Sequence, residues 1–352
     1  MTAARSVHID GVAHVSALGL SADAAAESLL ADKSKVAWRE VSGARHPWFA
    51  IPLEEQDWAA RVRRVIGLVG SELAAAGKES SGLTAVPLFI GSSSLQAGAI
   101  EADARARGTV DLSSHSACFG MEIGAMLGIA STPWVFSTAC TSGLAALEAA
   151  FTLIGCGRID EALVLGVEFA NDTTLAGFAS LGLLAATEKT GGLILGEATG
   201  GLRLTAHPRP GWRITACRLC IDSHSLTAPA PDGRAIAANI AAALADAGLE
   251  ADDIDLIKPH RGHMPGTDAA EEAAFGHVFG VRRPPEIALK RRLGHTLGAS
   301  GPAELAVLLT LLDTPAGQAR HGHPQRLLFN LVGFGGSLAA LIVERCTSGA
   351  RA

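Results

Sequence analysis

A cysteine at the junction of a strand pattern and a helix pattern could act as a nucleophile. Cys140 follows a short apolar run that ends at Ser137, and it directly precedes an amphipathic stretch at residues 142–157. A thiol at a helix N-terminus faces free backbone N–H groups and the positive end of the helix dipole, which favour the thiolate. The thiolate is a strong nucleophile, and the N–H groups can hold the oxyanion of a tetrahedral intermediate. A lone cysteine is more often a small core residue, but the small residues around Cys140 favour an exposed turn.

Two histidines in the second half of the chain lie where an imidazole could act in catalysis. His260 ends a strand pattern and precedes a glycine-containing loop, with a helix pattern beginning near Asp268. His295 follows Gly294 directly before another helix pattern, where it contributes little packing of its own. Each ring could serve as acid, base or oxyanion donor, although His260 alone is equally well interpreted as a surface histidine. His263 completes an H-x-x-H spacing, but no further Cys or His follows at ligand spacing, so we expect no metal.

Two further segments carry groups that could support such a site. Lys290 closes a strand pattern, and Glu304 lies along the helix pattern after His295, where its carboxylate could pair with the lysine. Phe334 stands among glycines, including Gly335, near the C-terminus. Glycines allow backbone N–H groups to approach a ligand closely, but this turn alone indicates no specific chemistry.

The composition limits the classes of protein to consider. The chain has 352 residues, of which 48% are hydrophobic and 18% charged, so it can bury a large core and is not disordered. Its net charge of -6 argues against a protein that binds nucleic acid. No apolar run approaches the ~20 residues of a membrane-spanning helix, and the N-terminus lacks the apolar block of a signal peptide. We therefore expect a cytoplasmic protein without a membrane span.

The six cysteines are irregularly spaced, which in a cytoplasmic chain favours free thiols over disulfides. Cys217 and Cys220 form a C-x-x-C pair within an alternating apolar segment at residues 212–222. No second pair of ligands is near, so we interpret this segment as a buried strand rather than as a metal or redox site.

Strand-like and helix-like segments alternate along the whole chain, which predicts an α/β architecture of packed layers. A break rich in proline and glycine at residues 206–212 is the best internal boundary. The two halves follow a similar order, each with a strand-to-helix site of small residues, and this favours a duplicated fold. Strands are predicted at residues 7–15, 86–93, 133–139, 161–170, 191–206, 212–222, 254–260, 327–336 and 338–345. Helices are predicted at residues 22–31, 58–77, 142–157, 233–249, 266–280 and 300–313.

Taken together, the four chemical segments are far more specific than any one of them. In order and in residue type they resemble the β-ketoacyl-acyl-carrier-protein synthase (ketosynthase) family, the condensing enzymes of the thiolase fold. The resemblance spans nearly the whole chain. The matching positions are residues 138–143; His260, Pro265, Asp268 and Glu271; Lys290, Gly294, His295, Gly298, Ala299, Gly301 and Glu304; and Asn330, Gly333, Phe334, Gly335, Gly336 and Ser337.

This resemblance implies a fold and a reaction. The fold is a thiolase-like, duplicated α-β-α-β-α architecture with two mixed sheets. Its N-terminal half, residues 1–210, carries the nucleophile, and its C-terminal half, residues 211–346, carries both histidines. The reaction is an acyl transfer followed by a decarboxylating Claisen condensation, in which Cys140 takes an acyl group from a carrier-protein or coenzyme A thioester. No cofactor is implied beyond the phosphopantetheine or coenzyme A that carries the substrates.

The resemblance also implies roles for the other residues. His260 and His295 donate hydrogen bonds to a malonyl-type extender and stabilise its enolate. The N–H groups of the nucleophile and of Phe334 form the oxyanion hole, and Phe334 with the glycine after it acts as a gate. Lys290 and Glu304 give structural and electrostatic support.

The sequence departs from the family at several positions. Arg261 stands where a glycine is usual, and Gly262 and Met264 replace two threonines that hold the pantetheine arm. The segments before Cys140 and at residues 184–192 are shorter than in the family. These departures favour a divergent member of a specialised fatty-acid, polyketide or polyene-like pathway. The alternative is a non-condensing partner subunit of the chain-length-factor type in a heterodimer, although the retained Cys–His–His set favours the enzyme.

Partner surfaces are less distinct in the sequence. Carrier proteins are acidic, so we expect a basic docking patch. Arg61, Arg63 and Arg64 lie on a helix pattern where the family often docks its carrier, although a solvated helix face is an equally good interpretation. The arginine pair at 291–292 is a weaker candidate. The resemblance implies a dimer paired through the strand pattern at 133–139, and both a homodimer and a ketosynthase heterodimer stay open.

Overall fold

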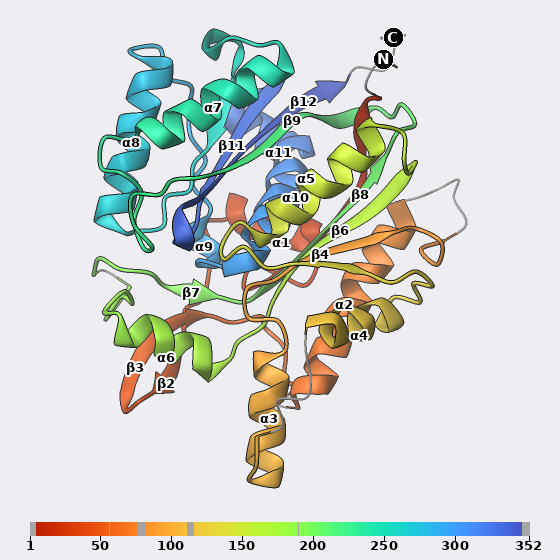
Figure 1. Cartoon of the computed structure of the whole chain (residues 1–352), viewed down its shortest axis with the longest axis vertical. Helices are drawn as coiled ribbons and strands as arrows, with labels where there is room; N and C mark the ends of the chain where they lie inside the picture. The colour runs from red at the N-terminus through yellow and green to blue at the C-terminus, as the bar shows by residue number, and fades with distance from the viewer. Residues whose placement is uncertain (1–4, 56, 77–81, 111–115, 189, 347–352) are drawn as a thin grey trace.

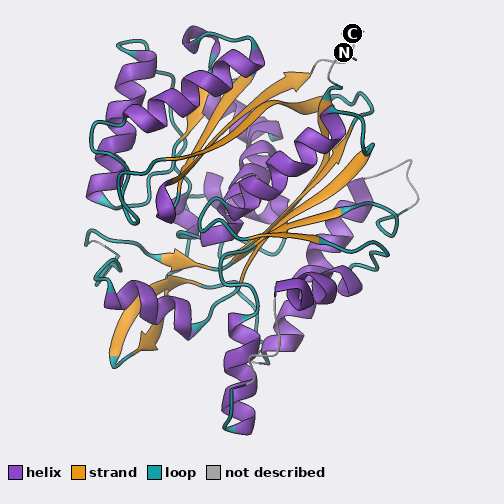
Figure 2. Cartoon of the chain, in the orientation of Figure 1, coloured by secondary structure: helices purple, strands orange, loops and turns teal. Residues whose placement is uncertain are grey.

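The computed structural model describes residues 5–55, 57–76, 82–110, 116–188 and 190–346 (Figures 1 and 2). Within these ranges the strands form one nine-stranded mixed sheet, in the order β10-β11-β12-β9-β1-β8-β6-β4-β5, and one three-stranded mixed sheet, in the order β2-β3-β7. The large sheet contains β1 (Val7–Ser16), β4 (Leu88–Gly91), β5 (Trp134–Phe136), β6 (Glu161–Glu168), β8 (Ala198–Thr205), β9 (Gly211–Ile221), β10 (Leu256–Lys258), β11 (Arg326–Val332) and β12 (Ser337–Cys346). The small sheet contains β2 (Ala37–Val41), β3 (Ala44–Phe49) and β7 (Leu195–Gly196).

The large sheet is built from one set of strands from each half of the chain. The two sets are joined where residues 7–9 of β1 pair antiparallel with residues 212–214 of β9. Figure 1 shows helices α5 and α10 between the two sets of strands, α7 and α8 over the outer face of one set, and α2 and α4 over the outer face of the other. This order confirms the predicted α-β-α-β-α layers. The helices are α1 (Ala22–Leu30), α2 (Trp58–Ala76), α3 (Ala97–Arg107), α4 (Ser116–Met126), α5 (Ser142–Gly155), α6 (Asp172–Ser180), α7 (Arg234–Ala247), α8 (Pro265–Phe279), α9 (Lys290–Leu293), α10 (Ser300–Asp313) and α11 (Pro315–His321).

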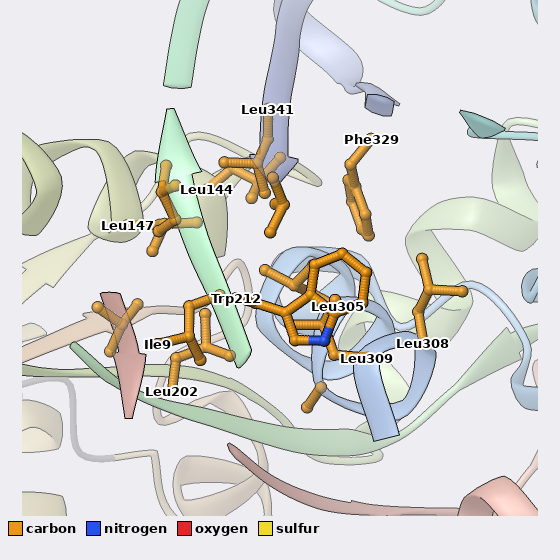
Figure 3. Packing of buried hydrophobic residues seen from close by; sticks show 14 of the residues in the cluster. Ile9, Leu144, Leu147, Leu202, Trp212, Leu305, Leu308, Leu309, Phe329 and Leu341 are labelled. Atoms are coloured by element: carbon orange, nitrogen blue, oxygen red, sulfur yellow. The ribbon is translucent and has the colours of Figure 1, made fainter. Parts of the chain in front are cut away.

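The two central helices lie in the main hydrophobic core. In α10, 12 of the 14 residues are buried, because the helix is apolar on every side and packs between layers. Leu305 and Leu308 of α10 belong to the same buried cluster as Leu144 of α5 and Phe329 of β11 (Figure 3). The nucleophile and one imidazole precede these two helices, so the packing of the core also fixes the site.

Glycines allow the central helices to contact the strands closely. A Cβ atom at Gly91 of β4 would overlap the backbone of Gly143 in α5. A Cβ atom at Gly200 of β8 would overlap the backbone of Ala303 in α10. Both glycines therefore set the depth at which the helices that start near the site lie against the sheet.

Every predicted strand and helix has a counterpart in the structure, with different boundaries in places. The predicted strand at 191–206 is divided into β7 and β8. The sequence analysis missed the hairpin of β2 and β3, whose turn residues Ser42 and Gly43 both have positive φ angles. It also missed helices α3, α4, α6, α9 and α11. Of the segments that appear shortened, residues 111–115 and 189 lie outside the described residues.

Three local expectations near the site need correction. Lys290 begins the short helix α9 instead of closing a strand. Strand β10 ends at Lys258, so His260 lies in the loop beyond it. Helix α8 begins at Pro265 rather than near Asp268, since proline is well suited to the first turn of a helix.

Two further predictions, on the C-x-x-C segment and on membrane-spanning helices, can be compared with the described residues. Cys217 and Cys220 lie in strand β9, as predicted, and both are free thiols. No helix in the described ranges combines the length and the apolar character that a membrane crossing requires.

Candidate active site

The thiol of Cys140 lies in a tight turn at the start of α5. Ala139 has a positive φ of 52°, which turns the chain sharply just before the cysteine. Ser142 closes this turn, because its Oγ accepts the N–H of Thr138 at 2.9 Å and donates to the carbonyl of Ala139 at 2.5 Å. The cysteine is only 3% exposed. The turn therefore presents the thiol to a closed cavity rather than to the surface.

The structure brings both predicted histidines to this thiol. The Nε2 of His295 lies 3.0 Å from the Sγ of Cys140. The rings of His260 and His295 are 5.4 Å apart between centroids and meet edge to face. On the other side of His295, Nδ1 lies 3.4 Å from the hydroxyl of Ser300. A hydroxyl can donate or accept, so His295 can adopt either neutral tautomer.

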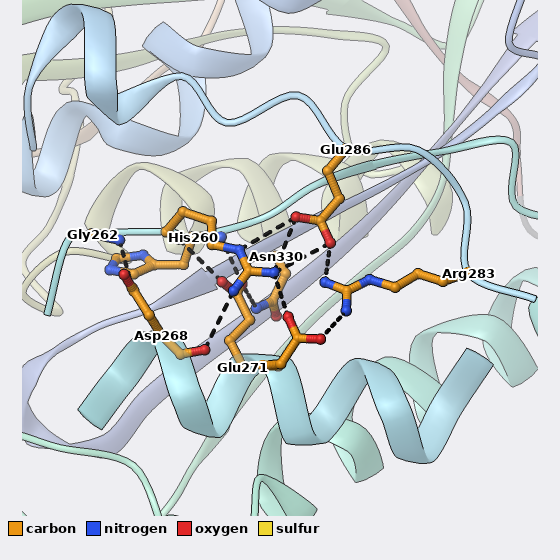
Figure 4. A network of polar contacts seen from close by, with 9 residues as sticks. His260, Gly262, Asp268, Glu271, Arg283, Glu286 and Asn330 are labelled. Carbon is orange, nitrogen blue, oxygen red and sulfur yellow. Dashed lines mark hydrogen bonds and ion pairs between the residues drawn. The ribbon is translucent and has the colours of Figure 1, made fainter. Parts of the chain in front are cut away.

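His260 is oriented by backbone and carboxylate contacts. The N–H of Val332 donates to its Nδ1 at 3.3 Å, so the neutral ring carries its proton on Nε2, which faces the cavity. Glu271 holds the backbone of the same residue, accepting the His260 N–H at 2.6 Å and the side-chain amide of Asn330 at 2.6 Å (Figure 4). Gly262 leaves the face of the ring open, because a Cβ there would lie 3.0 Å from Nε2.

Two buried lysines share one carboxylate below the imidazoles. Lys290 forms an ion pair with one oxygen of Glu304, as the sequence predicted, and Lys258 forms an ion pair with the other oxygen. Burial lowers the pKa of Lys290 to about 7 and lowers the pKa of Lys258 well below its ordinary value. The sequence analysis missed Lys258, although a charged residue at the end of a strand of isoleucine and leucine was a usable signal.

The protonation state of the thiol differs from the sequence prediction. Burial raises the pKa of Cys140 to about 11, and it outweighs the N–H of Phe334, the charge of Lys290 and the N–H of Cys140 itself, which all lower the pKa. The resting sulfur is therefore a thiol and not a thiolate at neutral pH. Burial and the lysine charges lower the pKa of both imidazoles, so His295 is neutral and can accept the proton of the thiol.

The cavity beside the sulfur is small, and the aromatic ring of Phe334 belongs to a residue that lines it. It has a volume of about 20 Å³ and is lined by residues that include Met264, Thr227 and Phe334. Phe334 stacks on Phe178 of α6, with 5.4 Å between the ring centroids. Gly335 has a φ of 74°, which turns the chain back after the phenylalanine. The backbone N–H groups of Phe334 and Cys140 face the sulfur, which is the arrangement expected of an oxyanion hole.

A second, open cleft reaches His295 from the side. It has a volume of about 480 Å³, and Lys290, Arg291, Arg292 and His263 line it with His295. His295 lines both the small cavity and this cleft, so the cleft lies next to the site.

The arginines of α2 are placed differently from one another. The guanidinium of Arg61 pairs with the buried Glu197 and donates to the carbonyl of Ile51 at 2.8 Å, so it is not free to bind a partner. Arg63 and Arg64 are exposed and line a separate surface cleft. Arg261 also has a structural contact, because it pairs with Glu286 at 3.1 Å.

Comparisons with known proteins agree with the fold. The model of the β-ketoacyl synthase N-terminal domain matches residues 102–207, and the model of the C-terminal domain matches residues 213–316. Together the two models cover more than half of the chain. The layered fold and the Cys–His–His cluster define a protein of the thiolase-fold class. The chain belongs to the β-ketoacyl synthase family.

Curated relatives match nearly two thirds of the chain. The 3-oxoacyl-[acyl-carrier-protein] synthase 2 of Mycobacterium tuberculosis is 28% identical over 271 residues, which cover 65% of this chain and 64% of the relative. The protein of the same name from Mycobacterium leprae is 30% identical over 268 residues, which cover 64% of this chain and 63% of the relative. The matched region therefore spans slightly less than two thirds of these relatives.

Solved structures match over nearly the whole chain. A ketosynthase in complex with its chain length factor from Xenorhabdus doucetiae has a TM-score of 0.82 at 22% identity, with coverage of 97% of this chain and 98% of that chain. A β-ketoacyl synthase from Burkholderia phymatum has a TM-score of 0.81 at 22% identity, with coverage of 97% and 100%. At these identities the likeness shows the fold.

Proposed function

We propose that the chain is an acyltransferase of the β-ketoacyl synthase type, which condenses an acyl thioester with a malonyl-type extender in a fatty-acid, polyketide or polyene-like pathway. The observation that carries this proposal is the 3.0 Å contact between the Sγ of Cys140 and the Nε2 of His295. A second imidazole, His260, lies beside the first with its N–H directed into the same cavity. A thiol, a neutral base and two N–H donors are the groups that this reaction needs.

In the first step the thiol of Cys140 takes the acyl group. His295 accepts the thiol proton at Nε2 as the sulfur attacks the carbonyl carbon of the acyl thioester. The N–H groups of Cys140 and Phe334 hold the oxyanion of the tetrahedral intermediate. The carbon–sulfur bond of the donor then breaks, and the departing thiolate takes the proton back from His295. The products are acyl-Cys140 and the free thiol of the carrier.

In the second step the extender loses carbon dioxide and forms the new bond. As the bond to the carboxylate carbon breaks, its electron pair forms an enolate whose oxygen accepts the Nε2–H groups of His260 and His295. The enolate carbon attacks the acyl carbonyl of acyl-Cys140, and the bond from that carbonyl to the sulfur breaks. The released thiolate takes up one proton from solvent, which completes the cycle. Between the two steps His295 changes tautomer by exchange with solvent, losing the proton of Nδ1 and gaining one on Nε2. Ser300 stabilises the second tautomer, because its hydroxyl can donate to Nδ1 of His295 while Nε2 carries the proton.

The substrates are proposed to arrive on an acyl carrier protein or on coenzyme A. The curated relatives carry "acyl-carrier-protein" in their names, and one solved neighbour is a ketosynthase in complex with an acyl carrier protein. Arg291, Arg292 and Lys290 line the open cleft that reaches His295, and Arg292 also pairs with Asp32. This cleft therefore offers cationic groups to the phosphate of a carrier arm. We therefore favour the arginine pair over Arg61 as the place where a carrier docks.

A dimer through β5 is also proposed. β5 is the last strand of the large sheet, and Trp134 in it is 57% exposed. An exposed edge strand with a large apolar side chain is a surface suited to pairing with another chain. Two of the solved neighbours are ketosynthases with their chain length factors, so a second copy and a related subunit are both candidate partners.

The second candidate function is a non-condensing partner subunit. The observation that favours it is the closed cavity of about 20 Å³ beside Cys140, which has no room for an acyl group unless Phe334 moves. This subunit would shape the acyl tunnel of a ketosynthase without using its own thiol. The complete Cys–His–His cluster favours the condensing enzyme.

A condensation assay separates the two functions. The purified chain is mixed with malonyl carrier protein and a panel of acyl thioesters, and both carbon dioxide and the condensed product are measured. We expect product with the native chain, none with Cys140→Ala, and unchanged yield with Cys156→Ala, which removes an exposed thiol outside the site. We expect His295→Ala to retain part of the acylation but to lower decarboxylation by about 10²–10⁴-fold. Absence of product from the native chain, together with a stable complex with a ketosynthase, would favour the partner subunit.

A further inference from the structure

Lys258 is a fully buried lysine directly beside the catalytic residues. It ends β10, two residues before His260, and its side chain has no exposure. Its Nζ lies 4.1 Å from the centre of the ring of Phe329, the residue opposite it in β11. Burial of an ammonium group is costly unless partners compensate for it. The aromatic face and Glu304 are such partners, and they offset part of the cost of burial that lowers the pKa of Lys258.

The partner of Lys258 is shared. Glu304 of α10 pairs through one oxygen with Lys258 and through the other with Lys290. The nearby carboxylate of Glu271 is engaged by the backbone N–H groups of His260 and Arg261. Two buried amines therefore share the carboxylate of Glu304, each paired with a different oxygen.

The charges of the two lysines act on the imidazoles. Both lysines lower the pKa of His260 and of His295, in addition to the effect of burial. A positive charge on either amine disfavours the uptake of a second positive charge by a neighbouring imidazole. The ionisable groups that face the two rings or their charged neighbours are Lys258, Lys290, Glu304, Glu271, Asp268, Glu168 and the thiol of Cys140.

We propose that Lys258 is a positioning residue of this site, and that its ammonium group, paired with Glu304 beside Lys290, keeps the rings of His260 and His295 neutral. The role in the reaction rests on the proposed function: only a neutral His295 can accept the proton of Cys140. A single lysine paired with Glu304 would form an ion pair with no net charge, which has little effect on the imidazole rings. The second lysine gives the group a net positive charge.

Nuclear magnetic resonance of ring-labelled histidines tests this proposal directly. Long-range ¹H–¹⁵N spectra of ¹⁵N-histidine protein report the protonation of each ring, and the variants His260→Asn and His295→Asn assign the two signals. In the native chain we expect both rings to stay neutral well below pH 6.5, with the proton of His260 on Nε2. In Lys258→Gln, which removes the charge but keeps a donor for Glu304, we expect both rings to titrate about one pH unit higher or more.

Three comparisons make the result specific. Lys258→Met removes the charge and keeps an apolar stem against Phe329, so it must shift the rings in the same direction. Lys258→Arg retains the charge and must leave both rings as in the native chain. Arg218→Gln removes an exposed charge of β9 and must leave them unchanged. The signal of His8, whose pKa is lowered by burial and by Arg213, reports an intact fold in every variant.

The proposal fails if both rings titrate in Lys258→Gln and Lys258→Met as they do in the native chain while His8 is unaltered. It also fails if Lys258→Arg shifts the rings as much as the neutral variants do. Because ring protonation is read without any substrate, these results hold whether or not the chain condenses thioesters. Loss of condensation in the assay above, with normal ring titration, would instead overturn the proposed function.

Discussion

At the scale of single residues, opposing effects meet at the sulfur of Cys140. The N–H groups at the start of α5 and the charge of Lys290 favour a thiolate, whereas burial favours the neutral thiol and outweighs them. The sequence predicts the first set of effects, because the order of strand, cysteine and helix is visible in it. It does not predict the burial, which arises when Phe334 and the second half of the chain close over the turn. The consequence is a thiol that reacts through His295 instead of standing ionised.

The pH dependence of Cys140 alkylation follows from this balance. The thiolate is the reactive form, and a pKa of about 11 means that its fraction keeps rising across the accessible pH range. We expect the rate of carboxamidomethylation of Cys140 by iodoacetamide, followed by peptide mass spectrometry, to rise about tenfold per pH unit between pH 7 and pH 9. The exposed Cys156 is the internal reference for reagent access. A rate that levels off near pH 7 would show a preformed thiolate and contradict this account.

At the scale of elements, the site depends on how deeply two helices pack against the strands. Helices α5 and α10 were predicted nearly to the residue, since each is a continuous helical pattern rich in alanine and leucine. The hairpin of β2 and β3 was missed, because its short strands mix charged and aromatic residues without a regular alternation of burial and lie outside the main sheet. The lysine at the end of β10 was missed because its partners, Glu304 and Phe329, are distant in the sequence. A local sequence pattern can predict a helix or strand. It cannot predict which charged residues of distant segments meet in the core.

The contact of β8 with α10 gives a prediction about stability. A methyl group at Gly200 would overlap the backbone of Ala303, so Gly200→Ala must move the helix or the strand. We expect a loss of about 1–3 kcal/mol in the free energy of unfolding, measured by urea denaturation. Gly67→Ala in α2 is the matched control, because nothing lies within 4 Å of the added atom and alanine favours a helix. Equal unfolding midpoints for Gly200→Ala and the native chain would contradict the proposed close packing.

At the scale of the whole molecule, the active site lies between the two halves of the chain. Cys140 comes from the first half, whereas His260, His295 and Phe334 come from the second. The sequence placed all four by their resemblance to one family, and the structure brings them together around one cavity. The closed state of that cavity and the open cleft beside it could not be predicted, because both depend on side chains and loops from distant segments. The boundary at residue 210 falls between β8 and β9, and the division of the chain into two halves at this point stays a prediction.

The central claim is that one thiol in this molecule takes an acyl group. The most direct measurement is intact-mass spectrometry of the chain after incubation with an acyl thioester, with the modified peptide identified by fragmentation. We expect the mass of one acyl group to be added per chain, located on Cys140, and no addition in Cys140→Ala. An acyl group on any other residue, or an unmodified native chain under conditions where a related ketosynthase is acylated, would contradict the claim.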